Sequence, residues 1–220
     1  MSSTTRARFR ASIALVAPVV LATGFVYHPY VAIPRESDIA AAAADDPTRW
    51  GVAHLLVGVG IGLIALAFLA VRSYLREAGE ERWSVRALPP VVLASALTAI
   101  LTGMEFAPLA AAETGGDVEA VQSELMPWFL VVNAASAVTL AIGMVGFALA
   151  IARSGVLSSR LTRIVVAGLL AVAVARVVPL GFGFYVVAVA GIVALWPLAY
   201  QMWEQPAGQA QGQPRPTPAI

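Results

Sequence analysis

Apolar segments long enough to cross a lipid bilayer dominate this chain, and they limit its fold more than any other feature. A helix needs about 20 consecutive apolar residues to span the hydrocarbon core. With 59% apolar and 12% charged residues, the composition lies outside the range of soluble domains, in which about a quarter of the residues are charged. We therefore expect an all-α, multi-pass membrane protein whose 220 residues form a bundle of six transmembrane helices.

The predicted helices follow the apolar runs and the breaks between them. The last run, 40 residues long, is too long for one crossing, and the stretch from Pro179 to Gly183 predicts a hairpin turn within it. An alanine run in the loop 34–49 predicts a short surface helix. Residues 1–10 form a polar leading segment, and residues 204–220, rich in Gln, Gly and Pro, predict a disordered tail. The six helices are expected at residues 11–33, 50–71, 88–112, 125–152, 161–178 and 180–203.

The distribution of arginine predicts how the bundle lies in the membrane. Lysine is absent, and in the six-helix scheme eleven arginines fall on one side, whereas only Arg35 and Arg49 lie in loops on the other. The positive-inside rule then places both termini in the cytoplasm. The abundance of Arg, Ala, Val and Gly suggests a GC-rich genome, so we expect a bacterial protein of the plasma membrane.

Four polar residues mark one face of the third predicted helix, which is expected to open at Pro89-Pro90, where missing amide donors cost least. The spacings between them of three, four and three residues place them in one stripe, which ends in a carboxylate. Each hydroxyl could simply bond its own helix or a neighbour, for about 0.6 kcal/mol. An intramembrane carboxylate is costly enough that it normally faces a partner or water, so the stripe predicts the wall of an outward-facing polar cavity. The stripe consists of Ser95, Thr98, Thr102 and Glu105.

Other polar residues of the apolar segments could line the same cavity. Asn133 and Ser136 share a face of the fourth predicted helix, and Arg176 is the single charge within the last apolar run. Glu105 and Arg176 each stand three residues before a proline near the same end of the bundle, which predicts an ion pair between them. The alternative is that Arg176 extends to the interface on its own. The cavity candidates are Glu105, Arg176, His28, His54, Asn133, Thr102 and Thr98.

His28 and His54 are the only two histidines, and they are predicted at one depth on adjacent helices. Such a pair could supply the axial ligands of a b-type haem, or, with Glu105, a metal site of two histidines and one carboxylate. Alternatively, both are helix-end residues that bond backbone carbonyls. His54 also shares a face with Gly58 and Gly62, a small-residue pattern that allows close helix contact, either within one chain or between two copies in a homo-oligomer.

Several classes of function are excluded by what the sequence lacks. The absence of Cys removes disulfides and thiolate metal sites, and the absence of Lys removes Schiff-base chemistry. No phosphate-binding glycine loop, nucleophile elbow or basic nucleic-acid surface occurs, so nothing predicts an enzyme. We therefore expect a protein of the lipid bilayer that binds or transports a small ligand or ion. The alternatives are a haem or metal redox protein that uses His28 and His54, and an accessory subunit with no site of its own.

Overall fold

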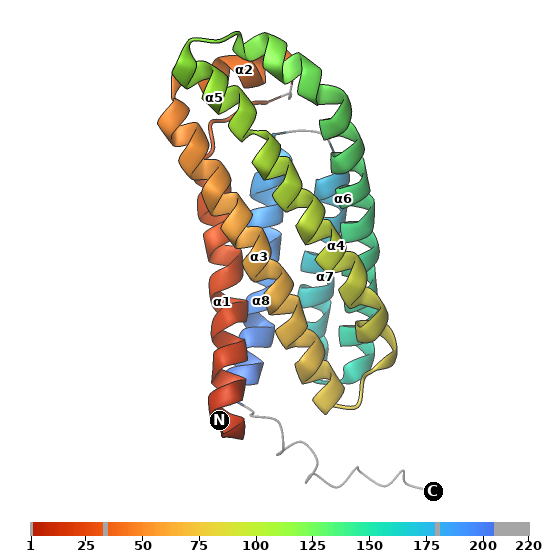
Figure 1. The fold of residues 1–220 in the computed structure, drawn as a ribbon. Helices are drawn as coiled ribbons and strands as arrows, with labels where there is room; N and C mark the ends of the chain where they lie inside the picture. The colour runs from red at the N-terminus through yellow and green to blue at the C-terminus, as the bar shows by residue number, and fades with distance from the viewer. Residues whose placement is uncertain (1, 33–34, 179–180, 205–220) are drawn as a thin grey trace, which may run out of the picture.

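Long helices run side by side between the two ends of the molecule (Figure 1). The computed structural model describes residues 2–32, 35–178 and 181–204, and within these ranges it contains helices and no strand. The long helices are α1 (Ser3–Tyr27), α3 (Pro47–Glu77), α4 (Arg82–Met104), α6 (Val118–Ser154), α7 (Ser159–Val177) and α8 (Phe182–Glu204). Two short helices, α2 (Glu36–Asp45) and α5 (Phe106–Thr114), cover one end of the bundle. The predicted all-α class and the short helix in the alanine run are therefore confirmed.

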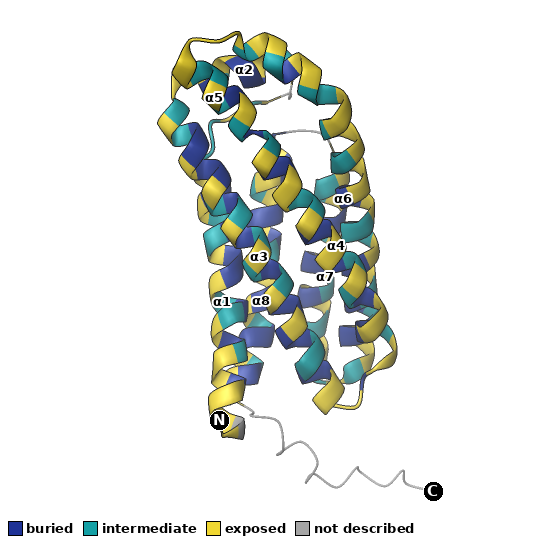
Figure 2. Ribbon diagram, viewed as in Figure 1, coloured by how far each residue is buried: buried dark blue, intermediate teal, exposed yellow. Residues whose placement is uncertain are grey.

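Among the residues that the structure describes, five helical segments are long and apolar enough to cross a membrane. They are Thr4–Tyr27, Pro47–Glu77, Arg82–Thr114, Val118–Ser154 and Phe182–Glu204. The long helix outside this set is α7, which has 19 residues and carries three arginines. Exposed residues occur along the length of the helices (Figure 2). They include large apolar residues such as Val59, Leu66, Val138 and Val189, as expected for a surface that faces lipid.

The long helices form a closed ring in chain order. Each packs against the helix before it and the helix after it, and α8 completes the ring against α1. The interior is filled by buried apolar side chains, and the rings of Phe68 on α3 and Phe147 on α6 meet there with their centroids 4.7 Å apart. The ring therefore encloses a packed apolar core over much of its length.

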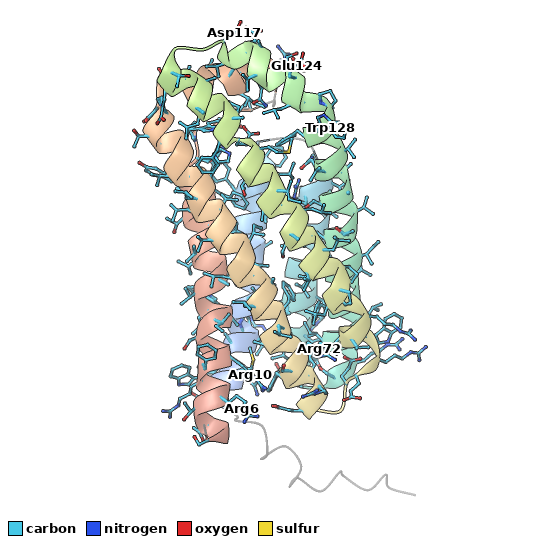
Figure 3. The ribbon with its side chains drawn as sticks, in the orientation of Figure 1. Arg6, Arg10, Arg72, Asp117, Glu124 and Trp128 are labelled. Carbon is cyan, nitrogen blue, oxygen red and sulfur yellow. The ribbon has the colours of Figure 1, made fainter. Side chains whose placement is uncertain are left out.

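Charges divide between the two ends of the bundle (Figure 3). Arg6, Arg10 and Arg72 lie at the end where α1 begins, and Asp117 and Glu124 lie at the opposite end, beside α2 and α5. At the first of these ends, Arg10 on α1 forms an ion pair with Glu77 on α3, with Nη1 and Oε1 2.7 Å apart. These two ends are called the arginine end and the acidic end below.

Most helices begin several residues before the predicted starts, because polar side chains outside the apolar runs cap them. Asp46 accepts a hydrogen bond from the backbone N–H of Arg49, and Asp117 accepts one from that of Ala120. Such caps satisfy amides that have no partner in the first helical turn. The predicted start of the first helix at residue 11 is wrong for the same reason, since α1 begins at Ser3 with Ser2 as its cap and includes most of the polar segment 1–10. Residues 205–220, which include most of the predicted tail, lie outside the described residues.

The prediction that α4 opens at Pro89-Pro90 is also wrong. The helix begins at Arg82, because the buried carboxylate of Glu80 accepts hydrogen bonds from the backbone N–H groups of Trp83 and Ser84 at 2.7 and 3.1 Å. The two prolines lie inside the helix, about two turns from its start.

The predicted helix 88–112 is interrupted at Glu105, which separates α4 from α5. Pro108 explains the break, because its ring has no N–H to bond the carbonyl of Met104 and clashes with that group. Gly115 then ends α5 in a left-handed conformation, with φ at 73°. Glu105 therefore lies at a discontinuity in the helix rather than in regular helical backbone.

Gly24 on α1 and Gly60 on α3 bring the backbones of these two helices close together. A Cβ atom added to Gly60 would lie 2.7 Å from the Cα atom of Leu21, and one added to Gly24 would lie 2.8 Å from the backbone nitrogen of Val57. Only residues without a side chain allow the two backbones to approach so closely.

The predicted packing face of Gly58 and Gly62 is therefore wrong. A Cβ atom at Gly62 would have no neighbour within 4 Å, and one at Gly58 would make an ordinary contact, 3.4 Å from the Thr102 hydroxyl. The reason is that α3 packs between α1 and α4, and Gly60 faces α1 while Gly58 faces the longer side chains of α4. A contact between two copies of the chain through Gly58 and Gly62 stays a prediction.

Candidate functional site

The two histidines meet near the acidic end, where α1 stops. His28 directly follows α1, which ends because Pro29 disfavours helical backbone in the residue before it, so the predicted helix 11–33 ends too late in the sequence. The rings of His28 and His54 touch edge to face, with their centroids 4.9 Å apart. Trp50 packs against both, with centroid distances of 5.0 Å to His28 and 4.6 Å to His54. The two histidines therefore meet, as their predicted equal depth implies, but His28 lies just after α1 and not on a helix, where the prediction placed it.

A backbone carbonyl fixes the orientation of each imidazole. Nδ1 of His28 lies 2.7 Å from the carbonyl oxygen of Pro29, and Nδ1 of His54 lies 2.8 Å from that of Trp50. Because a carbonyl only accepts hydrogen bonds, Nδ1 carries the proton in both rings, and Nε2 of a neutral ring keeps its lone pair. Burial lowers the pKa of His28, although the bond to Pro29 opposes this shift, so the neutral form is favoured at pH 7.

This pair does not fit the axial ligation of a haem. Trans ligands lie on opposite faces of the porphyrin, and with metal–imidazole bonds of about 2 Å their two nitrogens are about 4 Å apart, with the ring centroids farther apart still. Here the rings are in direct contact, at a centroid distance typical of packed aromatic pairs, with no space for a porphyrin between them. Within the described residues, Glu105 does not join the histidines in a group of three metal-binding side chains.

The carboxylate of Glu105 is buried at the break between α4 and α5. Its residue is 6% exposed, and within the described residues its Oε2 atom is buried with no hydrogen-bond partner. The indole N–H of Trp50 donates to the backbone carbonyl of Glu105 at 3.1 Å, which ties the break to the histidine cluster. An unsatisfied carboxylate oxygen in such a site can be satisfied only by a proton, a cation or a hydrogen-bond donor.

The predicted polar stripe of α4 faces inward. Ser95 and Thr102 are buried, and Thr98 is half-buried, so the three hydroxyls share the face that carries Glu105. The hydroxyls of Thr98 and of Ser136 on α6 lie 2.7 Å apart, and Ser136 also donates to the carbonyl of Ala94. Thr98 therefore joins α4 to α6 through an interhelical hydrogen bond, whereas the hydroxyl of Thr102 donates to the carbonyl of Ala99 in its own helix.

The predicted ion pair between Glu105 and Arg176 is not formed. Arg176 instead donates from Nη2 to the side-chain oxygen of Asn133 at 2.7 Å, which joins α7 to α6. Within the described residues, the salt bridge present is that of Arg10 with Glu77. The two charges do lie near the same end of the bundle, as predicted. Equal depth, however, does not determine the direction in which each helix presents its side chain.

Two residues of this region escaped the sequence-based prediction. Trp50 connects the histidines to Glu105, but an aromatic residue at the start of an apolar run is typical of an interface anchor. Gln122 on α6 is 1% exposed and its Oε1 atom has no partner among the described residues. Gln122 lies in an acidic stretch, which is typical of an exposed loop. One signal in the sequence indicates its burial: it lies one helical turn from the apolar residues Val118 and Met126, which pack against α2.

Comparison of the chain with protein-family models, with curated proteins and with solved structures finds no match in any of the three. The candidate site therefore rests on its residues and their geometry.

Proposed function

We propose that this chain crosses the plasma membrane six times, with both termini in the cytoplasm. The alternation of the long helices in the ring and the collection of arginines at one end support this topology. The sixth crossing would be α7, whose 19 residues extend over about 28 Å, close to the thickness of the hydrocarbon core.

Reporter fusions test this topology. A reporter that is active only outside the cytoplasm should be active when it is fused after Gly115 and inactive when it is fused at Gly79. Both glycines lie in turns with positive φ at opposite ends of the bundle. A reporter at the C-terminus should also be inactive, because six crossings return the chain to its starting side. Activity there would mean that α7 does not cross.

We propose further that the protein binds a small cation or protonatable ligand at Glu105, from the acidic end. The observation that carries this proposal is the buried Oε2 atom of Glu105, which lacks a partner at a break in the helix. Acidic side chains around α2 and α5 support it, because they raise the local concentration of cations at this end. The acidic residues at this end are Glu36, Asp38, Asp45, Asp46, Glu113, Asp117, Glu119 and Glu124.

Infrared difference spectroscopy of the protein in nanodiscs tests the binding role of Glu105. A buried carboxyl that lacks hydrogen bonds has a protonated C=O stretch at higher frequency than an exposed one, so its signal can be separated. We expect such a band to change between acidic and alkaline buffer and to be absent in Glu105→Gln. The matched control is Glu113→Gln, because Glu113 is exposed at the same end and should leave the band intact.

Transport is tested separately, with proteoliposomes that contain a pH-sensitive dye. Collapse of an imposed pH gradient should be faster with the wild-type protein than with Glu105→Gln. If the infrared band appears and the gradient decays equally in both, Glu105 binds a proton without moving it. If neither signal depends on Glu105, the proposal is wrong and an accessory role without a site of its own is favoured.

A further inference from the structure

Arg176 and Asn133 form a polar pair that has no role in the proposed cation binding at Glu105. The hydrogen bond from the guanidinium of Arg176 to Asn133 is the one side-chain contact that the described residues give this charge. No carboxylate within these residues forms a salt bridge with it. An arginine in an apolar helix normally pairs with another charge or with backbone carbonyls, and within the described residues the guanidinium of Arg176 bonds neither.

The groups that remain on this pair are mostly donors. A guanidinium has five N–H groups and no acceptor, and one of them is used by Asn133. The amide of Asn133 uses one lone pair of its oxygen for Arg176, which leaves the second lone pair and the two N–H bonds of its NH₂ group. A fork of donors with one positive charge fits an oxyanion, which can accept two parallel hydrogen bonds from arginine.

The position of the pair favours an oxyanion that arrives through the lipid. Asn133 lies five residues after Trp128 on α6, or about 7.5 Å further from the acidic end. Trp128 is 69% exposed and lies on α6 next to the acidic end (Figure 3), as expected for an anchor at a membrane interface. Asn133 on α6 and Arg176 on α7 are themselves only partly buried, so a ligand can reach the pair.

The acidic end opposes an approach from water. Its carboxylates repel free anions, whereas a headgroup held in the leaflet meets the bundle from the side. We propose that Arg176 and Asn133 bind the phosphate group of a phospholipid in the leaflet at the acidic end. This site is separate from Glu105, and either proposal can fail without the other.

Thermal unfolding of the delipidated protein in detergent tests this site. Phosphatidylglycerol should raise the Tm, whereas diacylglycerol with the same acyl chains, which lacks the phosphate, should not. In Arg176→Gln the apparent affinity for phosphatidylglycerol should fall roughly tenfold, as expected from the loss of a charge-assisted hydrogen bond. The matched control is Arg163→Gln, since Arg163 is an exposed arginine of the same helix near the arginine end.

A second variant keeps the test decisive if Arg176→Gln does not fold. Asn133→Asp supplies a carboxylate to Arg176, so it should raise the Tm without lipid and abolish the response to phosphatidylglycerol. If inorganic phosphate raises the Tm as much as phosphatidylglycerol does, the ligand is free phosphate and the proposal of a lipid headgroup is wrong. An equal response to diacylglycerol, or an unchanged response in both variants, would overturn the proposal.

Discussion

Replacing Gly60 by leucine is expected to be among the most destabilising single changes in this bundle. The new Cβ atom alone would lie within 2.8 Å of two backbone atoms of Leu21, and backbone cannot rotate away as a side chain can. Forcing extra atoms into such a contact costs about 3 kcal/mol or more. For a chain of this size that loss lowers the Tm by roughly 10 °C, which thermal unfolding in detergent would measure.

Gly62→Leu is the matched control, because it adds the same side chain to the same helix, where a Cβ atom meets nothing within 4 Å. Its Tm should stay close to that of the wild type. Equal losses in the two variants would show that α1 and α3 do not approach each other at Gly60.

Trp50→Ala should cause a loss of similar size, through a cavity rather than a clash. Trp50 is 2% exposed and packs against both histidine rings, and its indole N–H holds the backbone of Glu105 at the helix break. Truncation of a buried aromatic residue to alanine costs about 3–5 kcal/mol. Trp50→Phe keeps an aromatic ring in the site and removes the hydrogen bond, which costs about 1 kcal/mol of the free energy of unfolding. A comparison of the Tm values of Trp50→Ala and Trp50→Phe therefore separates the contribution of packing from that of the hydrogen bond.

Trp128→Ala provides the comparison, since Trp128 is 69% exposed and leaves no cavity inside the bundle. A loss in Trp128→Ala as large as in Trp50→Ala would mean that the anchor at the interface, rather than the cluster with the histidines, stabilises this end.

Patterns within one helix predicted its inward face correctly, whereas patterns that depend on two helices were less successful. The stripe that ends in Glu105 could be predicted because helical periodicity alone decides which residues share a face. The glycines of α3 show the limit of this reasoning. Gly58 and Gly60 lie on different faces of α3, and the sequence of one helix alone does not determine which of its faces packs against α1.

The partner of Arg176 could not be predicted for a similar reason. Depth follows from the distance to a helix end, and it was correct in placing Arg176 and Glu105 near the acidic end. The choice between Glu105 and Asn133 depends on the rotation of α7 against α6, which many small packing contacts determine together. Helix starts were missed because hydropathy counts apolar residues, whereas capping by Glu80 or Asp117 extends helices into polar sequence.

The closure of the ring by α8 against α1 has a consequence for biogenesis. The indole of Trp196 on α8 donates a hydrogen bond to the carbonyl of Leu15 on α1, across 181 positions of sequence. During synthesis α1 enters the membrane before α8, and the side of α1 that meets α8 stays without its native neighbour until α8 has been inserted. Phe25 on α1, whose ring stacks on that of Phe184 on α8 with the centroids 5.0 Å apart, lacks this partner during that interval. Closure of the ring therefore depends on contacts between segments far apart in the sequence, and such contacts form more slowly than local ones.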